Sequence, residues 1–149
     1  DEIGTMHISV QESLLTVLDS GVFYKVGSVV EQKVDVRFLS ATNADLKEML
    51  FRGDFRRDLY NRISDCVIRI PALRERPEDV LEILEHYLHA YNCRDITFST
   101  GAVDFLLNFY WPGNTRDVIR CSKYLVSRYA GKKVCAEDIA SWTEKHCFV

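Results

Sequence analysis

The sequence predicts an α/β layer followed by an α-helical bundle, and three observations carry this prediction. Over residues 1–70, segments rich in β-branched and aromatic residues alternate with amphipathic helical segments. Residues 71–149 contain helical patterns joined by short links. A chain of 149 residues is also long enough to bury a core. We therefore expect two subdomains, 1–70 and 71–149, with the boundary at Pro71.

The composition excludes several classes of protein. A net charge of −3 and a pI of about 5.8 argue against a dedicated nucleic-acid binder, which needs a basic surface to neutralise phosphates. No apolar run reaches the roughly 18 residues of a membrane span, and no signal peptide opens the chain. Five cysteines without a C-x-x-C pair indicate reduced thiols in a cytoplasmic protein. Residues 1–4 are no initiator sequence, so we expect a piece of a longer protein.

The first elements are a helix and a hairpin. Ser9 can cap a helix over residues 9–19, and Gly21 can end it. Its buried stripe is predicted to contain Val10, Leu14, Val17 and Leu18. Residues 22–26 and 29–38 are predicted to pair around a turn at Gly27.

A central strand at residues 34–41 follows, and it breaks at Thr42 and Asn43, where a short polar side chain suits a helix N-cap. Helices are predicted over residues 43–51 and 55–63. A second strand at 65–70 ends at Pro71, which cannot donate to a ladder. A polar residue at a strand tip, followed by arginines on a nearby helix, suits contact with a phosphate or another anion.

Four helices are predicted after Pro71. The first begins at Pro77, and Ser99 and Asn114 cap the second and third. The second is expected to bury Val103, Leu106, Leu107 and Tyr110. A final helix covers residues 137–145, so this part is expected to form a small bundle.

Five short motifs occur in a fixed order. They are Asp1-Glu2-Ile3-Gly4, the run from Val34 to Asn43, Phe55 to Arg62, Ala72 to Arg76, and Trp111 to Arg116. In this order the sequence resembles the AAA+ ATPase domain of the sigma-54-dependent transcriptional activators (bacterial enhancer-binding proteins), and the match covers nearly the whole chain. The resemblance implies a partial AAA+ α/β subdomain (1–70) followed by the helical lid (71–149).

The resemblance also implies roles for the first acidic residues. Asp1 and Glu2 are similar to the end of a Walker B motif, in which the aspartate holds Mg²⁺ and the glutamate activates the attacking water. Asn43 is similar to the sensor I residue that contacts the γ-phosphate of ATP. The alternatives are a solvated loop for Asp1 and Glu2 and a plain helix cap for Asn43.

Arg56 and Arg62 are similar to the paired arginine fingers that reach a nucleotide in the neighbouring subunit. A guanidinium binds phosphate bidentately, which a lysine cannot do. Six residues at roughly 100° each put the two about 120° apart on one helix. We therefore expect one arginine to enter the neighbour's site and the other to brace the interface. Arg57 is expected to be merely solvated.

Arg116 is similar to the sensor II arginine of the lid, which faces nucleotide bound by its own subunit. The family usually has glutamate next, where Asp117 stands here, so the acid's partner contact is expected to shift. Arg74, Glu75 and Arg76 are expected to form structural ion pairs.

Two family motifs are missing from the sequence. Neither the phosphate loop G-x-x-x-x-G-K-[ST] nor the sigma-contacting loop Gly-Ala-Phe-Thr-Gly-Ala occurs. In the complete domain both precede the position of Asp1, so the chain resembles the second half of the domain. We expect it to be nucleotide-free and inactive alone, while the complete domain binds ATP and Mg²⁺. Residues 34–41 and 66–70 are then expected to be paired by another copy, by rearrangement or by further chain.

The implied activity is ATP hydrolysis in a ring of copies, a hexamer or heptamer, that remodels sigma-54 RNA polymerase. No DNA-binding domain follows the lid in this sequence. The alternative is a non-catalytic module that assembles or regulates without turnover. DNA binding by the lid is disfavoured, because acidic residues (Asp104, Asp117, Glu137, Asp138) offset the basic ones (Arg116, Arg120, Lys123, Arg128). A cysteine nucleophile at Cys147 beside His146, and a metal site at His86 and His89, lack the further residues that such sites need.

Overall fold

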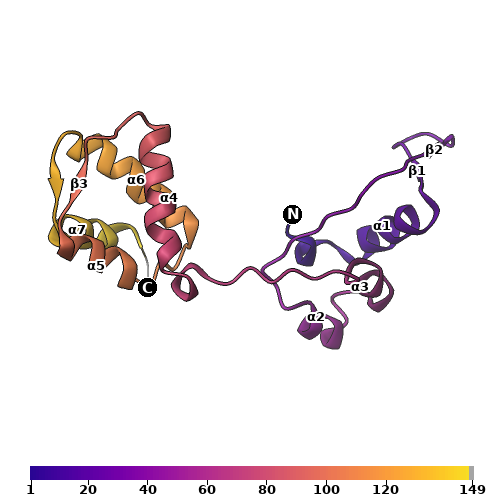
Figure 1. Cartoon of the computed structure of the whole chain (residues 1–149). Coiled ribbons are helices and arrows are strands. Elements are labelled where there is room, and N and C mark those ends of the chain that lie inside the picture. The colour runs from indigo at the N-terminus through magenta and orange to yellow at the C-terminus, as the bar shows by residue number, and fades with distance from the viewer. Residues whose placement is uncertain (148–149) are drawn as a thin grey trace. The chain divides into compact units, whose positions relative to one another are not determined.

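The computed structural model describes residues 1–147. Within them the chain folds as two compact units that divide between Ile68 and Arg69, each with its own hydrophobic core. Figure 1 traces both along the chain, from indigo at the N-terminus to yellow at the C-terminus. No helix within residues 1–147 is both long and apolar enough to cross a membrane.

The first unit consists of short helices and one hairpin. Its elements are η1 (Ile3–Thr5), α1 (Ile8–Ser20), β1 (Val22–Tyr24), β2 (Glu31–Lys33), α2 (Leu46–Arg52) and α3 (Arg57–Ile63). Ile3, Phe55 and Leu59 are buried at its centre, and apolar side chains of α1, α2 and α3 pack around them. The small core therefore joins the start of the chain to the segment that carries Arg56 and Arg62.

Helix α1 confirms the first predicted helix, but its buried stripe differs. The inward side chains are Gln11, Leu14, Leu15 and Leu18. Val10, expected inside, is 50% exposed. His7 rather than Ser9 occupies the N-cap, whereas Gly21 ends the helix as predicted, with φ of 66°.

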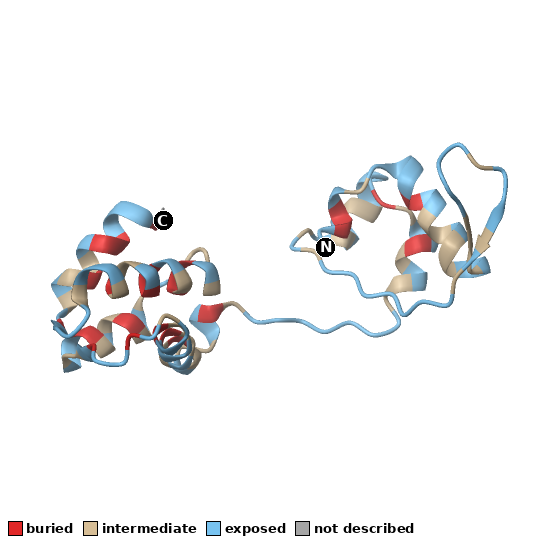
Figure 2. Ribbon diagram, turned by 90° about the horizontal axis from the view of Figure 1, so that it is seen from above, coloured by how far each residue is buried: buried red, intermediate tan, exposed pale blue. Residues whose placement is uncertain are grey.

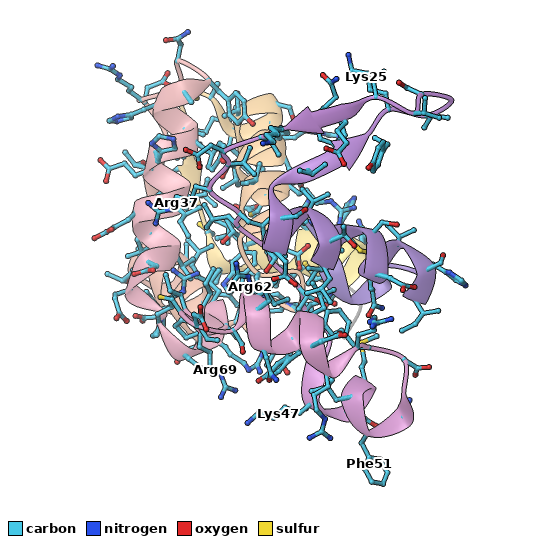
Figure 3. The ribbon with its side chains drawn as sticks, turned by 90° about the vertical axis from the view of Figure 1, so that its right-hand side faces the viewer. Lys25, Arg37, Lys47, Phe51, Arg62 and Arg69 are labelled. Atoms are coloured by element: carbon cyan, nitrogen blue, oxygen red, sulfur yellow. The ribbon has the colours of Figure 1, made fainter. Side chains whose placement is uncertain are left out.

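The predicted hairpin is confirmed but is shorter than expected. Strands β1 and β2 are antiparallel, with Val22 opposite Lys33 and Tyr24 opposite Glu31. The Tyr24 hydroxyl donates to Oε1 of Glu31 at 2.8 Å across the pair. Lys25 lies beyond β1, near the tip of this hairpin (Figure 3).

The two predicted strands at 34–41 and 65–70 are not formed. Both segments are extended but carry no ladder. Their exposed apolar residues include Val36, Phe38, Leu39, Val67, Ile68 and Ile70. In Figure 2 the long stretches of ribbon without helix or strand are mostly pale blue, the colour of exposed residues. A β-branched pattern shows that a segment suits a buried sheet, but a strand also needs a neighbour to pair its backbone groups. Within the described residues no segment pairs along either one, and no rearrangement covers them.

Two helix starts also differ from the prediction. Asp45, not Asn43, caps α2: its Oδ1 accepts from the backbone N–H groups of Lys47 at 2.9 Å and Glu48 at 3.2 Å. Arg56 lies at the N-cap of α3 with an extended backbone. Asn43 and Arg56 therefore both precede their helices, because Asp45 and the turn after Gly53 set where those helices begin.

The second unit confirms the predicted four-helix bundle. Its elements are η2 (Leu73–Glu75), α4 (Glu78–Ala90), β3 (Thr97–Phe98), α5 (Thr100–Asn108), α6 (Thr115–Tyr129), β4 (Lys133–Val134) and α7 (Ala136–His146). Ser99 caps α5 as predicted, and its Oγ accepts from Ala102 N at 3.1 Å. Strands β3 and β4 form a short parallel pair. Tyr110, expected inside, is 51% exposed.

Candidate functional site

The first residues of the chain lie against the segment that contains Asn43. Ile3 N donates to the carbonyl oxygen of Ala41 at 3.0 Å. Ile3 itself is buried. This contact places Glu2 beside Asn43. The first motif therefore lies against the C-terminal end of the second.

Gly4 is required by the closeness of this contact. A Cβ at Gly4 would lie 2.9 Å from both Cβ of Ala44 and Oγ1 of Thr42. Carbon atoms do not approach this closely without a shift of one of them. The glycine of the first motif therefore lets the two segments touch.

Glu2 has an unusual backbone at this edge. Its φ of 53° and ψ of 49° lie in the left-handed region, which a non-glycine residue rarely adopts. The Glu2 carboxylate lies 3.4 Å from the backbone N of Asn43, which donates to Oε2. The Asn43 side chain is exposed and forms no hydrogen bond with other described residues. The amide is thus free to contact a ligand while its own backbone holds Glu2.

Asp1 could supply one ligand to a metal ion. Its Oδ1 accepts from Glu2 N at 3.2 Å, and the residue is exposed. Among residues 1–147 no group of three His, Cys, Asp or Glu side chains could hold a metal by itself. Mg²⁺ usually binds one or two carboxylates and completes its shell with water and substrate phosphates. A single carboxylate here fits a Mg²⁺ that arrives with a nucleotide and does not fit a tightly held structural ion.

Arg56 is bound by acidic side chains of its own unit. It donates through two nitrogens to the two carboxylate oxygens of Asp58, at 3.0 and 2.7 Å, and Glu12 lies 3.8 Å away. Hydrogen bonding to Arg56 lowers the pKa of Asp58 to about 2. The Arg56 side chain remains 34% exposed, beside a shallow depression lined also by Arg57 and Asn61.

Arg62 contacts the end of α1 instead. Its Nε lies 3.2 Å from Oδ1 of Asp19, and an Nη donates to the carbonyl oxygen of Leu18 at 3.1 Å. The side chain is 52% exposed and is labelled in Figure 3. Arg56 precedes α3 and Arg62 lies in its last turn, so the expected 120° separation around one helix was wrong. Both arginines are accessible, and each already has an acidic partner.

Gln11 is a positioning residue that the sequence analysis missed. It is fully buried, and its amide nitrogen donates to the carbonyl oxygens of Met6 at 2.9 Å and Asp54 at 3.1 Å. Its Oε1 accepts from Arg56 N at 2.9 Å. Gln11 therefore ties α1 to the turn that presents Arg56. The available signal was a polar residue at helical spacing from Leu14, Leu15 and Leu18.

Arg116 belongs to the second unit, in the first turn of α6. Its side chain is exposed and forms no ion pair with other described residues. Next to it, Asp117 is buried, and its Oδ2 accepts from Gly113 N at 2.7 Å. A Cβ at Gly113 would lie 2.5 Å from Oδ1 of Asp117, so this turn needs glycine. The acid after Arg116 thus organises the turn before α6 and leaves Arg116 free.

Asn114 anchors the segment that precedes the bundle. Its Oδ1 accepts from Leu73 N at 2.8 Å, and Leu73 is fully buried. Asn114 occupies the predicted N-cap of α6, but its side chain makes no capping bond there. The residue that the sequence suggested as a cap therefore fixes η2 to the bundle.

The predicted ion pairs of the Arg74 segment are formed. Arg74 lies 3.9 Å from Oε1 of Glu75, and its guanidinium covers the Tyr110 ring at 4.9 Å from the centroid. Arg76 pairs with Asp79 at 2.7 Å. These contacts explain why Tyr110 stays on the surface, since an arginine covers its exposed face.

Two known families match consecutive parts of the chain. Residues 1–69 match the family described as Sigma-54 interaction domain, and residues 74–146 match the AAA+ ATPase lid domain. The two matches together cover nearly the whole chain. The predicted fold class, an α/β part followed by a helical lid, is thereby confirmed.

Similar curated proteins are regulators. The Nif-specific regulatory protein of Herbaspirillum seropedicae is 42% identical over 125 residues, which are 81% of this chain and 23% of that protein. The DNA-binding transcriptional regulator NtrC of Escherichia coli (strain K12) is 35% identical over 144 residues, which are 93% of this chain and 30% of NtrC. The chain therefore spans about a quarter to a third of the length of these relatives.

Solved structures with this fold have been determined with nucleotide. NtrX from Brucella abortus in complex with ATP is 29% identical, with a TM-score of 0.82 over 92% of this chain and 34% of that one. The same protein in complex with ADP is 30% identical, with a TM-score of 0.80 over 92% of this chain and 33% of that one.

Proposed function

Because the chain belongs to the sigma-54-dependent transcriptional activators, of whose AAA+ ATPase domain it corresponds to the C-terminal part, we propose that it supplies the hydrolytic half of a nucleotide site. The Glu2 carboxylate is the base that orients and deprotonates the attacking water, and the Asn43 side chain contacts the γ-phosphate. The contact between these two residues, 3.4 Å from Asn43 N to Glu2 Oε2, carries the proposal.

Hydrolysis of ATP requires that the attacking water is positioned and that the charge on the transferred phosphoryl group is stabilised. In phosphoryl transfer, charge spreads over the oxygens of the transferred group, so fixed donors and a well-placed base lower the barrier. The backbone of Glu2 is held in the left-handed region by its contacts, and the Asn43 N–H fixes its carboxylate. Asp1 would hold the Mg²⁺ that accompanies ATP, which supplies Lewis-acid stabilisation of the phosphates.

We propose that arginines supply positive charge to nucleotide. Arg116, unpaired among the described residues, would contact nucleotide held by its own subunit. One of Arg56 and Arg62 would contact nucleotide held by the next copy in a ring, and the other would brace the interface. The one that contacts nucleotide must first release its acidic partner, Asp58 for Arg56 or Asp19 for Arg62. Because these pairs are exposed, exchange for a phosphate costs little.

The unpaired segments at 34–41 and 65–70 support a larger domain. Their exposed β-branched side chains suit strands of a parallel sheet that is covered on both faces. We infer that further chain, which would carry the phosphate loop and the sigma-contacting loop, pairs them. The complete protein would then use ATP hydrolysis in a ring to remodel sigma-54 RNA polymerase in the cytoplasm.

The test is ATP hydrolysis, measured on the 149-residue chain and on the complete protein translated from its gene. We expect no turnover by the chain alone above a Glu2→Ala control. In the complete protein we expect Glu2→Ala to lower kcat about 10²- to 10⁴-fold with ATP binding retained, while Glu144→Ala, at an exposed position of α7, leaves kcat within about twofold. Unchanged turnover in Glu2→Ala would show that Glu2 is not the base, whereas no turnover by the complete protein itself would favour a module that assembles without hydrolysis.

A further inference from the structure

A cavity lies inside the second unit, between α4 and the segment that carries β3 and the start of α5. Its volume is about 300 Å³, and all of its lining residues belong to this unit. An apolar cavity of about 150 Å³ already holds benzene, and pockets for small ligands begin at about 300 Å³. The space is therefore large enough for a small organic molecule.

The walls of the cavity are apolar. Leu84, Leu88 and Ile96 line it and yet expose only 2%, 6% and 8% of their surfaces. A protein partner typically covers about 800 Å² of the surface it binds, whereas these three residues expose almost none. The low exposure indicates a narrow space that suits a small molecule better than a protein surface. The other apolar side chains that line the cavity are Leu81, Phe98 and Val103.

The rim of the cavity carries charged side chains. Glu85, His89 and Arg94 line it and are exposed. Oε1 of Glu85 lies 3.9 Å from Nε2 of His89, one turn further along α4. Asp95, next to Arg94 in the chain, accepts from the Cys93 thiol at 3.5 Å. Arg94 forms no ion pair with another described residue, so the rim offers one cation without a local partner.

We propose that this cavity binds a small amphiphilic carboxylate. The aliphatic or aromatic body of the ligand enters between the apolar walls, and its carboxylate meets the guanidinium of Arg94, which can bind both oxygens. Burial of the apolar body supplies most of the affinity, because an ion pair at an exposed rim adds little. The walls therefore set the affinity, and Arg94 sets the preference for an anionic end.

A nucleotide does not suit this cavity. The sugar and phosphates of ATP would lose their hydration against the apolar walls without enough hydrogen bonds in return. The cavity also contains none of the residues proposed to act on ATP. Carboxylate binding and ATP hydrolysis therefore stand or fall separately.

The experiment is calorimetric titration of the 149-residue chain with octanoate, octanol and octylammonium, which share one chain length and differ in charge. We expect octanoate to bind at one molecule per chain, with a Kd about two- to fivefold lower than that of octanol. Octylammonium should bind most weakly. Hexanoate buries two fewer CH₂ groups, so its Kd should be about tenfold higher than that of octanoate. Octanoate should also raise Tm, because it binds only the folded unit.

Arg94→Gln tests the rim of the cavity. We expect the Kd for octanoate to rise about two- to fivefold and the Kd for octanol to stay unchanged. Arg128→Gln alters an exposed arginine of α6 that does not line the cavity, so it should change neither value. Equal losses of octanoate and octanol binding in Arg94→Gln would contradict a contact between Arg94 and the carboxylate.

Val103→Phe and, separately, Leu81→Phe test the walls. Each places an aromatic ring in the cavity and should weaken octanoate binding about tenfold or more, because the filled space no longer admits the chain. Val126→Phe enlarges a half-buried side chain of α6 outside the cavity and should leave the Kd unchanged. Thermal unfolding followed by circular dichroism identifies any variant that fails to fold, and one folded wall variant is enough for the test.

Four outcomes would overturn the proposal. In the first, octanoate shows no saturable binding. In the second, a folded wall variant binds octanoate as the original chain does. In the third, octylammonium binds as tightly as octanoate, so the cavity does not select an anion. In the fourth, the 149-residue chain binds octanoate but the complete protein does not, which would show that a side chain from elsewhere in that protein fills the cavity.

Discussion

The backbone N–H of Asn43 donates to the Glu2 carboxylate across 3.4 Å, although the two residues are 41 positions apart in the sequence. The contact uses the backbone of Asn43 and leaves its side-chain amide exposed. One residue can therefore hold the proposed base and also contact a phosphate. A substitution that removes only the Asn43 side chain should therefore remove the phosphate contact and keep the contact with Glu2.

Asn43→Ala in the complete protein is expected to keep the Glu2 contact and lose the phosphate contact. We expect kcat for ATP hydrolysis to fall about 10- to 10³-fold, as for loss of one donor to a charged transition state, with ATP binding changed far less. Steady-state hydrolysis and nucleotide titration measure the two effects. Asn108→Ala, at an exposed position in the second unit, is the matched control. A fall in ATP affinity with unchanged kcat would contradict the assignment.

Mixing two inactive variants of the complete protein tests whether the arginines act between copies. We expect Glu2→Ala and Arg56→Ala each to abolish hydrolysis alone. A mixture forms some interfaces with an intact Glu2 on one side and an intact Arg56 on the other, so activity should reappear. Arg62→Ala is tested in the same way, and Arg57→Ala should remain active alone. If no mixture regains activity, Arg56 and Arg62 do not act in trans.

Gly4→Ala is expected to destabilise the first unit. The new Cβ would meet Ala44 and Thr42 at 2.9 Å, and relief of such overpacking typically costs about 1–3 kcal/mol. Urea denaturation measures the free energy of unfolding. Gly101→Ala is the control, because its Cβ would meet its nearest neighbour at an ordinary 3.8 Å. Equal stability of the two variants would show that the segments can separate without cost.

Asn114→Ala is expected to destabilise the second unit by about 1–3 kcal/mol, because the buried N–H of Leu73 loses its acceptor. Asn108→Ala removes an exposed bond to the Asp104 carbonyl and should cost less than about 1 kcal/mol. Denaturant unfolding followed by tryptophan fluorescence reports the change, since Trp111 is buried in this unit. A smaller loss for Asn114→Ala than for Asn108→Ala would refute the anchoring role.

The Arg56–Asp58 pair predicts a pH dependence of stability. The pKa of Asp58 is lowered from 3.8 to about 2 by its bond to Arg56. A lowered carboxyl pKa stabilises the folded state above the unfolded value and loses that contribution as the pH falls through the folded value. We expect Tm to fall between pH 4 and pH 2 (the range of these pKa values), and less steeply in Asp58→Asn. Thermal melts across this range measure the change. Equal slopes of Tm against pH in the original protein and in Asp58→Asn would show that the pair does not contribute to stability.

Much of the chain could be predicted from local pattern. The existence of α1, the amphipathic spacing of the four lid helices and the Gly21 helix end depend on neighbours within a few residues. The order of the five motifs indicated the family and the residues of the proposed site. These features depend on residues that are close together in the sequence or on their order along it, so the sequence by itself determined them.

The remaining features depend on contacts between distant residues. Residues 34–41 have the pattern of a strand, yet a strand also needs a partner, and none is present in the described chain. The sequence shows only that Gln11 is a polar residue on a helix. In the structure its buried side chain hydrogen-bonds to the backbones of Arg56 and Asp54 and so connects α1 to the turn before α3. The approach of Glu2 to Asn43 exists only because Gly4 leaves room beside Ala44. Only the tertiary structure decided these points, because pairing and close packing require two segments to be in place at once.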